Sequence, residues 1–575
     1  MQTRIKLVSL GFLIGFLLVV GRLFFWQILK GAELSEQARR QYQFGQTLSA
    51  PRGRILAQDG SPLSDRSEAW LVYAALDELE ESTNSIAEKL APMFLEGEYE
   101  SKDERYTALL SEIDRINSLL VRDDVVWIPL KQRITSDDKS AIEAMDIGGI
   151  GFEYNEDRSY PESSSAAHLL GFVGKNDEGL EQGYFGLEGY YDIMLSGKPG
   201  YLSRESDARG TPILPGELNE VSAIGGVDLV THIDKSIQIT IEKKLVDGLE
   251  KYGAVAGSII VMDPSTGAIM GMSSYPSYDP AEYTDFGNEY FRNPVVSDSF
   301  EPGSIFKVLV MSAGLDSDAV EPDTKCGICD QPLKVAQYYI RTWNNEYRED
   351  ATMQDVIVHS DNVGMAFVGQ KLGADTLYDY LDKFGIGHTT DVDLQGEGTP
   401  SIREKGTWNI VDLATTSFGQ GIAATPIQIL RAIGSIANDG VLVTPQVVDR
   451  LEGEGWEEDV KPEIGEEVIS KKTADEVTAM MVEAAKEGEA KWTHLRGFNI
   501  AGKTGTAQIP IAGHYDEDKT IASYIGFAPA DDPKFIMLVT LREPSSSPWA
   551  SETAAPLWYS IAKDLFLHFG IQPED

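Results

Sequence analysis

The sequence predicts an α+β fold in which helices flank an antiparallel sheet, preceded by one membrane-spanning helix. From residue 228, "DLVTHID" reads as a strand ending in Asp234, which is a good N-cap for a helix through about Tyr252. Two hairpins are also predicted, in "GSIIVMDPSTGAIMGMSSYP" and, near the other end, in "TIASYIGFAPADDPKFIMLVTLRE" before a final helix. Strands at both ends of a mainly helical segment are typical of a single antiparallel sheet with helices packed beside it.

The N-terminal segment predicts a membrane anchor. Residues 7–29 are apolar with few exceptions, and at a rise of about 1.5 Å per residue they can cross a hydrocarbon core of about 30 Å. Arg4 and Lys6 precede the run, so residues 1–6 are expected to stay in the cytoplasm. A cleaved signal peptide is the alternative, but the run exceeds a typical signal-peptide core and no small-residue cleavage site follows promptly. We expect an uncleaved anchor in the cell membrane, with the rest of the chain outside the cytoplasm.

The composition excludes nucleic acid as a partner. At 42% hydrophobic and 24% charged residues, the 575-residue chain is typical of globular proteins. It has 49 Lys and Arg against 91 Asp and Glu, a formal net charge of −42. A surface this acidic repels phosphate polyanions.

The two cysteines, Cys326 and Cys329, form a C-x-x-C pair. A zinc site needs two more ligands and no histidine lies nearby, while a thioredoxin-like motif would open a helix in a βαβ unit. We therefore expect a local disulfide or two free thiols in a surface loop. We expect no metal and no cofactor.

The chain divides into an N-terminal module and a C-terminal domain. The module is expected over residues 30–227 and the domain over residues 228–575, where the strand and helix pattern begins. Within the module, residues 77–145 are charged and periodic, as in "YTALLSEIDRINSLL", and predict an amphipathic helical insertion.

Three short motifs follow one another in the C-terminal domain. They are Ser304-x-x-Lys307 in "SFEPGSIFKVL", Ser360-Asp-Asn362 in "HSDNVG", and Lys503-Thr504-Gly505-Thr506 in "AGKTGTAQ". Pro302 and Gly303 stand where a helix should begin, so the serine and lysine of the first motif are expected to lie one turn apart on one face. Each motif is weak alone: Ser136-Asp-Asp-Lys139 matches the first pattern as well and is interpreted as structural.

Together and in this order, the motifs resemble those of serine β-lactamases and penicillin-binding proteins. Over nearly its whole length the chain is similar to class B penicillin-binding proteins, which are monofunctional peptidoglycan DD-transpeptidases. "PRGRILAQDG", "RSYPESSSAAHLLGFVG", "GLEGYYDIMLSGKPG" and "SFGQGIAATPIQILRAIGSIANDG" are further segments of this kind. "FEPGSIFK" and "SDNVGMA" resemble the septal, cell-division branch more than the elongation branch. Ala57, Gln58 and Ile305 depart from the usual Asp, Arg and Thr, and none of them removes a reacting group.

The resemblance implies a role for each motif residue. Ser304 would form an acyl-enzyme, with Lys307 as its base; burial and the nearby Lys503 would keep that base partly neutral. Ser360 would relay a proton to the leaving amine, and Asn362 would hold the substrate peptide.

The same resemblance implies how the substrate is bound. The backbone N–H groups of Ser304 and Thr506 would form the oxyanion hole. Lys503, Thr504 and Thr506, with Gly505 between the two threonines, would bind the terminal carboxylate of a D-Ala-D-Ala stem peptide. D-Ala would leave, an amine of a neighbouring stem peptide would take the acyl group, and β-lactams would acylate the serine as inhibitors.

The resemblance also implies an elongated α+β N-terminal module, a serine β-lactamase-like transpeptidase domain, and membrane partners. Glu156-Asp157-Arg158 echoes the start of a glycosyltransferase motif, but no histidine follows at the needed spacing. The lipid-linked precursor would therefore be polymerised by a partner, a polytopic SEDS-type glycosyltransferase among divisome or elongasome membrane proteins.

Two alternatives remain open. A carboxypeptidase or β-lactamase would pass the acyl group to water, although no Glu-x-x-Leu-Asn follows Ser360 as a class A β-lactamase requires. A β-lactam sensor or scaffold would act by docking partners, and usually has further membrane spans or a cytoplasmic output domain. Labelling with a fluorescent penicillin distinguishes most of these functions.

Overall fold

The computed structural model describes residues 1–35, 43–95, 99, 101–205, 218–511 and 514–574. The chain forms two compact units, one of Met1–Arg52 with Ser196–Gly226 and the other of Gly53–Leu195 with Val227–Asp575. The division predicted at residues 227 and 228 stays a prediction.

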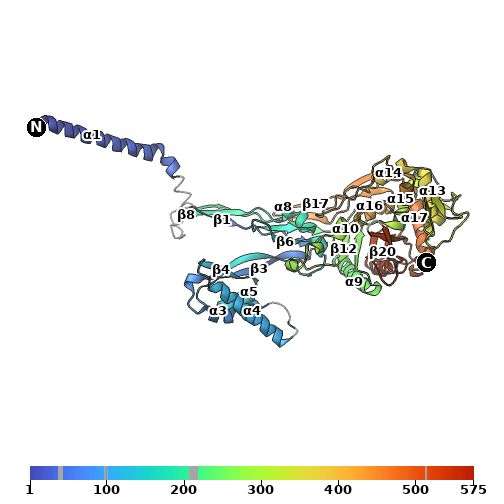
Figure 1. Cartoon of the computed structure of the whole chain (residues 1–575), viewed down its shortest axis with the longest axis horizontal. Coiled ribbons are helices and arrows are strands. Elements are labelled where there is room, and N and C mark those ends of the chain that lie inside the picture. Colours follow the sequence, from blue (N-terminus) through green and yellow to red (C-terminus); the bar gives the residue numbers. More distant parts are fainter. Residues whose placement is uncertain (36–42, 96–98, 100, 206–217, 512–513, 575) are drawn as a thin grey trace. The chain divides into compact units, whose positions relative to one another are not determined.

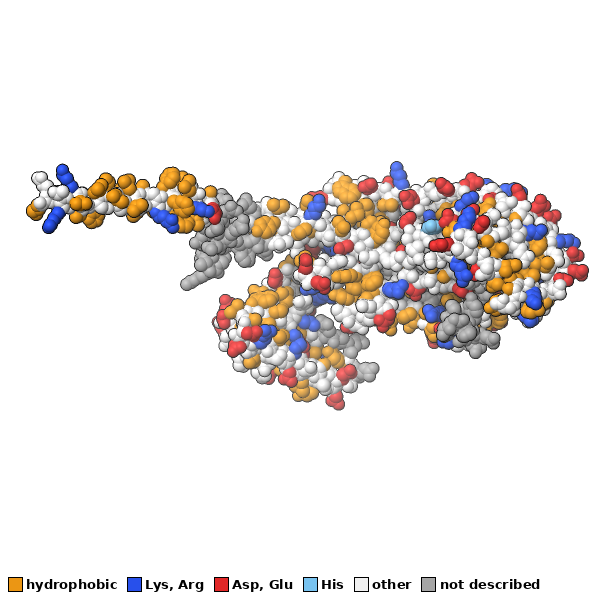
Figure 2. Space-filling view, turned by 45° about the horizontal axis from the view of Figure 1, so that its top comes forward, with side chains coloured by type: hydrophobic (Ala, Val, Ile, Leu, Met, Phe, Trp, Pro, Cys, Tyr) orange, Lys and Arg blue, Asp and Glu red, His pale blue; other side chains and the backbone are white. Residues whose placement is uncertain are grey.

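The first unit contains the N-terminal helix and a small sheet. Helix α1 (Gln2–Phe24) continues into a π-helical turn, η1 (Phe25–Leu29), and is the one helix in the described residues long and apolar enough to cross a membrane. Apolar side chains cover it along its length (Figure 2). Its position agrees with the predicted anchor, and its orientation in a membrane stays a prediction. The sheet is antiparallel, in the order β1 (Gln43–Leu48), β8 (Gly200–Glu205), β9 (Leu218–Val221).

The second unit contains the predicted antiparallel sheet. Its strands, in order, are β12 (Ile269–Tyr275), β11 (Ala256–Met262), β21 (Phe535–Arg542), β20 (His514–Ala528) and β19 (Ala501–Ile511). The two hairpins predicted from opposite ends of the domain meet where β11 pairs with β21, with Ile259 opposite Val539. The predicted α+β fold is thereby confirmed, and β19 is the last strand of the order.

Helices cover both faces of this sheet. On one face lie α9 (Lys235–Tyr252), capped by Asp234 as predicted, and α18 (Ala554–His568). Figure 1 shows α9 beside β12. Strand β21 serves both faces because successive side chains alternate: Met537 and Val539 pack with these helices, whereas Ile536 and Leu538 pack on the other side. This double burial explains why β21 reads as a continuous apolar run.

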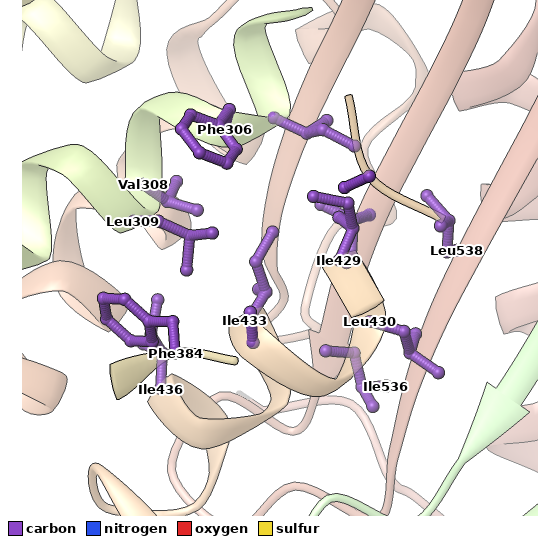
Figure 3. Close-up of a cluster of buried hydrophobic side chains, with 14 of the residues drawn as sticks. Phe306, Val308, Leu309, Phe384, Ile429, Leu430, Ile433, Ile436, Ile536 and Leu538 are labelled. Carbon is purple, nitrogen blue, oxygen red and sulfur yellow. The ribbon is translucent and has the colours of Figure 1, made fainter. Parts of the chain in front are cut away.

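The helical middle of the domain packs on the second face. Its main helices are α11 (Lys307–Asp316), α12 (Met353–Val358), α13 (Asn362–Leu372), α14 (Ala374–Lys383), α15 (Ile410–Thr416), α16 (Pro426–Ala437) and α17 (Lys471–Glu487). Figure 3 shows Val308 and Leu309 of α11 on one side of Ile433, with Ile536 and Leu538 of the sheet on the other. Helix α11, which carries the first motif, therefore packs against α16 inside the core of the domain.

The predicted helical insertion, residues 77–145, contains helices as expected and also one strand, β4 (Trp127–Ile134). Helices α3 (Thr83–Phe94), α4 (Lys102–Leu120) and α5 (Ser136–Glu143) pack against strands β3 (Pro62–Ala75), β4 and β5 (Ile150–Ser159). Strand β4 was not predicted, because its alternating buried and exposed side chains lie within a segment dominated by helical spacing. Strands β2 (Ile55–Leu56), β10 (Asp228–Thr231), β16 (Val448–Gly453) and β17 (Trp456–Asp459) extend this sheet.

The remaining elements are short. They are β6 (Phe172–Lys175), β7 (Glu181–Tyr184), β13 (Leu333–Val335), β14 (Tyr338–Ile340), β15 (Val441–Val443), β18 (Ile464–Glu467), α6 (Ala167–Leu170), α7 (Gly186–Tyr190), α8 (Asp192–Leu195), α10 (Pro294–Ser297), and the 3₁₀ turns η2 (Leu76–Glu78), η3 (Pro280–Asp285), η4 (Asn288–Tyr290), η5 (Gly303–Phe306) and η6 (Lys491–Thr493).

Two motif-like patterns have structural roles. Ser136 begins α5, where its hydroxyl donates to Glu68 and accepts from the Trp70 indole, and Lys139 pairs with Glu143. Arg158 is interpreted as structural too, since its side chain is buried against the equally buried carboxylate of Glu188.

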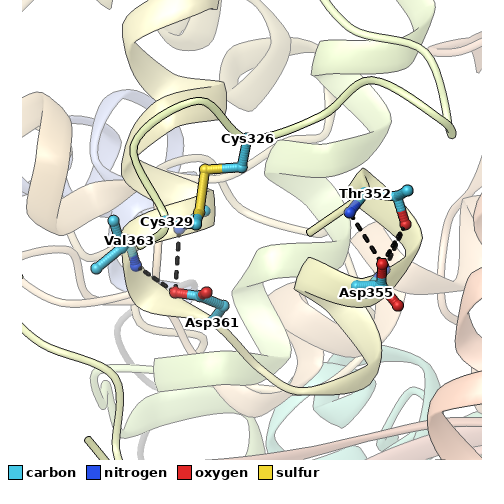
Figure 4. Close-up of a disulfide and its surroundings, with 7 residues drawn as sticks. Cys326, Cys329, Thr352, Asp355, Asp361 and Val363 are labelled. Carbon is cyan, nitrogen blue, oxygen red and sulfur yellow. Dashed lines mark hydrogen bonds between the residues drawn. A yellow bond between two sulfur atoms is a disulfide. The ribbon is translucent and has the colours of Figure 1, made fainter. Parts of the chain in front are cut away.

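Cys326 and Cys329 form a local disulfide, one of the two expected alternatives (Figure 4). The expected surface position is wrong, because both side chains are fully buried in the core of the helical middle. Free Cys and cystine pack as small apolar groups, which suits this position. Nearby, the carboxylate of Asp361 caps α13 by accepting from the backbone N–H groups of Val363 and Gly364 (Figure 4).

Candidate active site

Ser304 lies in the 3₁₀ turn η5, which leads directly into α11 at Lys307. The sequence predicted one helix from the serine onward. The first turn is 3₁₀ instead, as is frequent at helix N-termini. Gly303 has φ +56°, a left-handed conformation that favours glycine, and its backbone N–H donates to the carbonyl of Gly419 at 3.0 Å. The turn leaves Ser304 half-buried at the wall of a cleft.

Lys307 joins the first motif to the second. Its side chain is fully buried, and its Nζ donates to the carbonyl oxygen of Ser360 at 2.6 Å and to Oδ1 of Asn362 at 2.7 Å. Nζ lies 3.2 Å from Oγ of Ser360. The amide orientation of Asn362 is well defined, since its Nδ2 donates to the carbonyl of Arg341 at 2.9 Å. Because both Oδ1 and the Ser360 carbonyl can only accept, they use two N–H bonds of the amine.

Ser360 has an uncommon backbone conformation, with φ 57°. A non-glycine residue in this left-handed region costs about 1 to 2 kcal/mol and persists only where its surroundings determine it. Here the conformation turns both the carbonyl and the hydroxyl of Ser360 toward Lys307, just before Asp361 caps α13.

Lys503 connects the third motif to the same hydroxyl. Its Nζ donates to Oγ of Ser360 at 3.0 Å and contacts the carbonyl and Oγ1 of Thr504 at 3.2 and 3.3 Å. The hydroxyl of Thr504 in turn donates to Oε2 of Glu489 at 3.0 Å. Both lysine Nζ atoms therefore contact the same hydroxyl, that of Ser360.

Gly505 allows β19 to approach the turn that carries Ser304. A Cβ at this position would lie 2.8 Å from Cγ2 of Ile305 and 3.1 Å from the carbonyl oxygen of Pro302, which is closer than normal contact permits. The next residue, Thr506, faces the cleft, and its Oγ1 accepts from the backbone N–H of Ala550 at 3.0 Å. The lack of a side chain at Gly505 thus brings the third motif beside the first.

The cleft has a volume of about 210 Å³. Four of the predicted residues line it: Ser304, Ser360, Asn362 and Thr506. Lys307, Lys503 and Thr504 are buried behind this wall, at 0%, 3% and 6% exposure. The structure therefore brings all three motifs to a single site.

Sequence reasoning missed several residues of the cleft. Trp343 and Trp549 lie with ring centroids 5.5 Å apart, and Glu489 follows the end of α17. No local pattern marks these residues, because each comes from a loop that only the tertiary structure brings to the site.

Burial and charge both act on the two lysines. Desolvation, and next the charge of Lys503, lower the pKa of Lys307 from 10.5 to about 7, while Glu489 and Asp361 oppose this shift. Burial also lowers the pKa of Lys503, and Glu489 again opposes it. A neutral Lys307 amine has two N–H bonds, which the Ser360 carbonyl and Asn362 use, and one lone pair that remains to accept a proton.

Comparisons with known proteins agree with this fold. The penicillin binding protein transpeptidase domain matches residues 257–566, and the penicillin-binding protein dimerisation domain matches residues 47–231. Stage V sporulation protein D of Bacillus subtilis is 30% identical over 589 residues, which cover 100% of this chain and 86% of that protein. Peptidoglycan D,D-transpeptidase FtsI of Escherichia coli is 25% identical, covering 97% of this chain and 90% of its own.

The fold is also found among solved structures. Penicillin Binding Protein 2X from Streptococcus thermophilus aligns with a TM-score of 0.74 at 23% identity, covering 92% of this chain and 80% of that one. Matches to both the transpeptidase and the dimerisation domain, together with a relative at 30% identity along the whole chain, establish the family. This chain belongs to the class B penicillin-binding proteins.

Proposed function

We propose that this chain cross-links peptidoglycan by D,D-transpeptidation through an acyl-enzyme on Ser304. The observation that carries the proposal is the buried Lys307, with a pKa of about 7, hydrogen-bonded to the second motif at the wall of the cleft that Ser304 lines. A relative in Escherichia coli is named peptidoglycan D,D-transpeptidase, which supports the same reaction.

The first half-reaction is acylation. Lys307 accepts the proton of the Ser304 hydroxyl, and Oγ attacks the carbonyl carbon of the penultimate D-Ala. The backbone N–H groups of Ser304 and Thr506 stabilise the oxyanion, and one such donor is typically worth about 3 to 4 kcal/mol. The proton then passes through Ser360 to the nitrogen of the terminal D-Ala as the C–N bond breaks. The 3.2 Å contact between Nζ of Lys307 and Oγ of Ser360 supports this transfer.

The second half-reaction transfers the acyl group. An amine of a neighbouring stem peptide attacks the ester carbonyl, loses a proton to the basic groups of the site, and forms the new amide. Ser304 regains its proton as the C–O bond breaks.

Substrate binding is assigned to the third motif. Lys503 and the Thr506 hydroxyl would bind the terminal carboxylate, which β-lactams also carry, and Thr504 would contribute through its contact with Lys503. As the last strand of the sheet, β19 also offers an edge to which an extended stem peptide can add.

Transpeptidation is expected to be distinguishable from hydrolysis by its product. The protein is incubated with a pentapeptide ending in D-Ala-D-Ala and a diamino peptide as acceptor, and the products are identified by mass spectrometry. We expect one D-Ala released for each new amide bond. D-Ala release with only the shortened acid as product would indicate a carboxypeptidase. Acylation by a fluorescent penicillin, with no D-Ala released from the pentapeptide, would indicate a β-lactam sensor.

We further propose that the chain works at the division septum with a polytopic SEDS-type glycosyltransferase that contacts the anchor and the N-terminal module. A relative named FtsI and the resemblance of two motif segments to the septal branch support this setting. A fluorescent fusion of the full chain is expected to concentrate at midcell in dividing cells, and membrane crosslinking is expected to capture the glycosyltransferase there. A fusion spread along the sidewall, with no such protein captured, would contradict the proposal.

A further inference from the structure

Glu489 lies in the cleft, yet the reaction described above does not use it. Among the described residues that line the cleft, Glu489 has the only charged side chain. It follows Gly488, where a Cβ would lie 2.9 Å from the carbonyl oxygen of Val358 and 2.3 Å from that of Ala484. The chain therefore passes close to the end of α12, and this places the Glu489 carboxylate beside the second and third motifs.

The contacts of Glu489 form a chain of hydrogen bonds with a defined direction. The Thr504 hydroxyl has a single proton, which it donates to Oε2 of Glu489 at 3.0 Å. Thr504 is then an acceptor for Nζ of Lys503 at 3.3 Å, and the same Nζ donates to Oγ of Ser360 at 3.0 Å. The carboxylate thus holds the third motif in the orientation that reaches Ser360.

Thr506 differs from Thr504 in this respect. Its Oγ1 already accepts from the backbone N–H of Ala550 at 3.0 Å, so its own proton is free to point into the cleft. The two hydroxyls of the third motif therefore have different tasks: one is committed to Glu489, and the other faces the substrate.

The charge of Glu489 acts on both lysines. It opposes the lowering of the pKa that burial imposes on Lys503, and it opposes the lowering of the pKa of Lys307 by burial and by Lys503. Asp361, at the start of α13, is the other carboxylate that acts on Lys307. Without Glu489, both lysines would lose their protons at a lower pH.

We propose that Glu489 is a positioning residue for acylation, which holds the Thr504 hydroxyl and through it the Lys503 ammonium against Ser360. The inference rests on the proposed function and adds a residue that acts through Thr504 rather than on the substrate. Thr506 is left as the hydroxyl donor to the terminal carboxylate.

The test is the pH profile of acylation by a fluorescent penicillin in Glu489→Gln, which keeps the shape of the side chain and removes its charge. Because the anion near both lysines is lost, the rise of the rate with pH is expected to move down by about one pH unit. Glu487→Gln is the matched control: it removes the same charge two residues away, where the side chain is 62% exposed and lies 3.9 Å from Lys491. Its profile is expected to match that of the wild type.

A second ligand separates positioning from direct repulsion. The methyl ester of the same penicillin lacks the carboxylate, so a shift that arises at the lysines is expected with both ligands. A shift seen only with the carboxylate would mean that Glu489 repels the ligand, and this result would overturn the inference. No shift, or an equal shift in Glu487→Gln, would overturn it as well.

A third variant separates the position of the carboxylate from its charge. Glu489→Asp keeps the charge but shortens the side chain by one methylene, so the wild-type pH profile is expected with a rate reduced about tenfold. A wild-type rate in this variant would contradict a positioning role. Acylation that persists in Ser304→Ala would instead contradict the proposed function, and the inference with it.

Discussion

Ser304→Ala is expected to abolish covalent labelling by a fluorescent penicillin and the release of D-Ala from stem peptides. Losing a serine nucleophile typically costs about 10⁶-fold in turnover. The substitution removes only a half-buried hydroxyl from η5, and the backbone N–H that we assign to the oxyanion hole stays. The measurement is fluorescence of the protein band after labelling, together with mass spectrometry of the modified peptide.

Ser136→Ala is the matched control for this variant. It alters the other Ser-x-x-Lys pattern, where the hydroxyl contacts Glu68 and Trp70. Labelling is expected to be unchanged, with a loss of about 1 kcal/mol in the free energy of unfolding. If Ser304→Ala were still labelled, the nucleophile would lie elsewhere and the proposed mechanism would fail.

Lys307→Met is expected to reduce the acylation rate by about 10²- to 10⁴-fold, the range typical of a lost general base. In the wild type, the rate is expected to rise with pH through about 7, because only the neutral amine can take the proton of Ser304 and burial and Lys503 lower its pKa to that value. The variant is expected to lose this rise. Stopped-flow acylation across a pH series measures both effects.

Lys307→Arg separates the base from the charge. A guanidinium cannot be deprotonated in a protein, so this variant keeps the cation and removes the base. It is expected to be about as slow as Lys307→Met, and Lys139→Met, on α5, is expected to react like the wild type. An arginine variant that kept the wild-type rate would show that Lys307 acts only through its charge.

Much of the fold could be predicted because its signals are local. Asp234 caps α9, and the Asp-Pro-Ser-Thr-Gly turn joins β11 to β12, as the sequence predicts. Strand β4 could not be predicted, because its alternation is short and lies among helical spacings. The burial of Cys326 and Cys329 also escaped prediction, since two cysteines three residues apart do not reveal how the chain packs around them.

The sequence by itself determined the order and the identity of the reacting groups, from Ser304 to the third motif 199 residues later. It also placed Gly505 where β19 approaches the turn that carries Ser304. Only the tertiary structure decided that Lys307 is desolvated, that Lys503 shares its hydroxyl partner, and that Glu489 contacts Thr504. The physical reason is that a lysine pKa depends on the dielectric and the charges around the amine, and these are set by segments far apart in the chain.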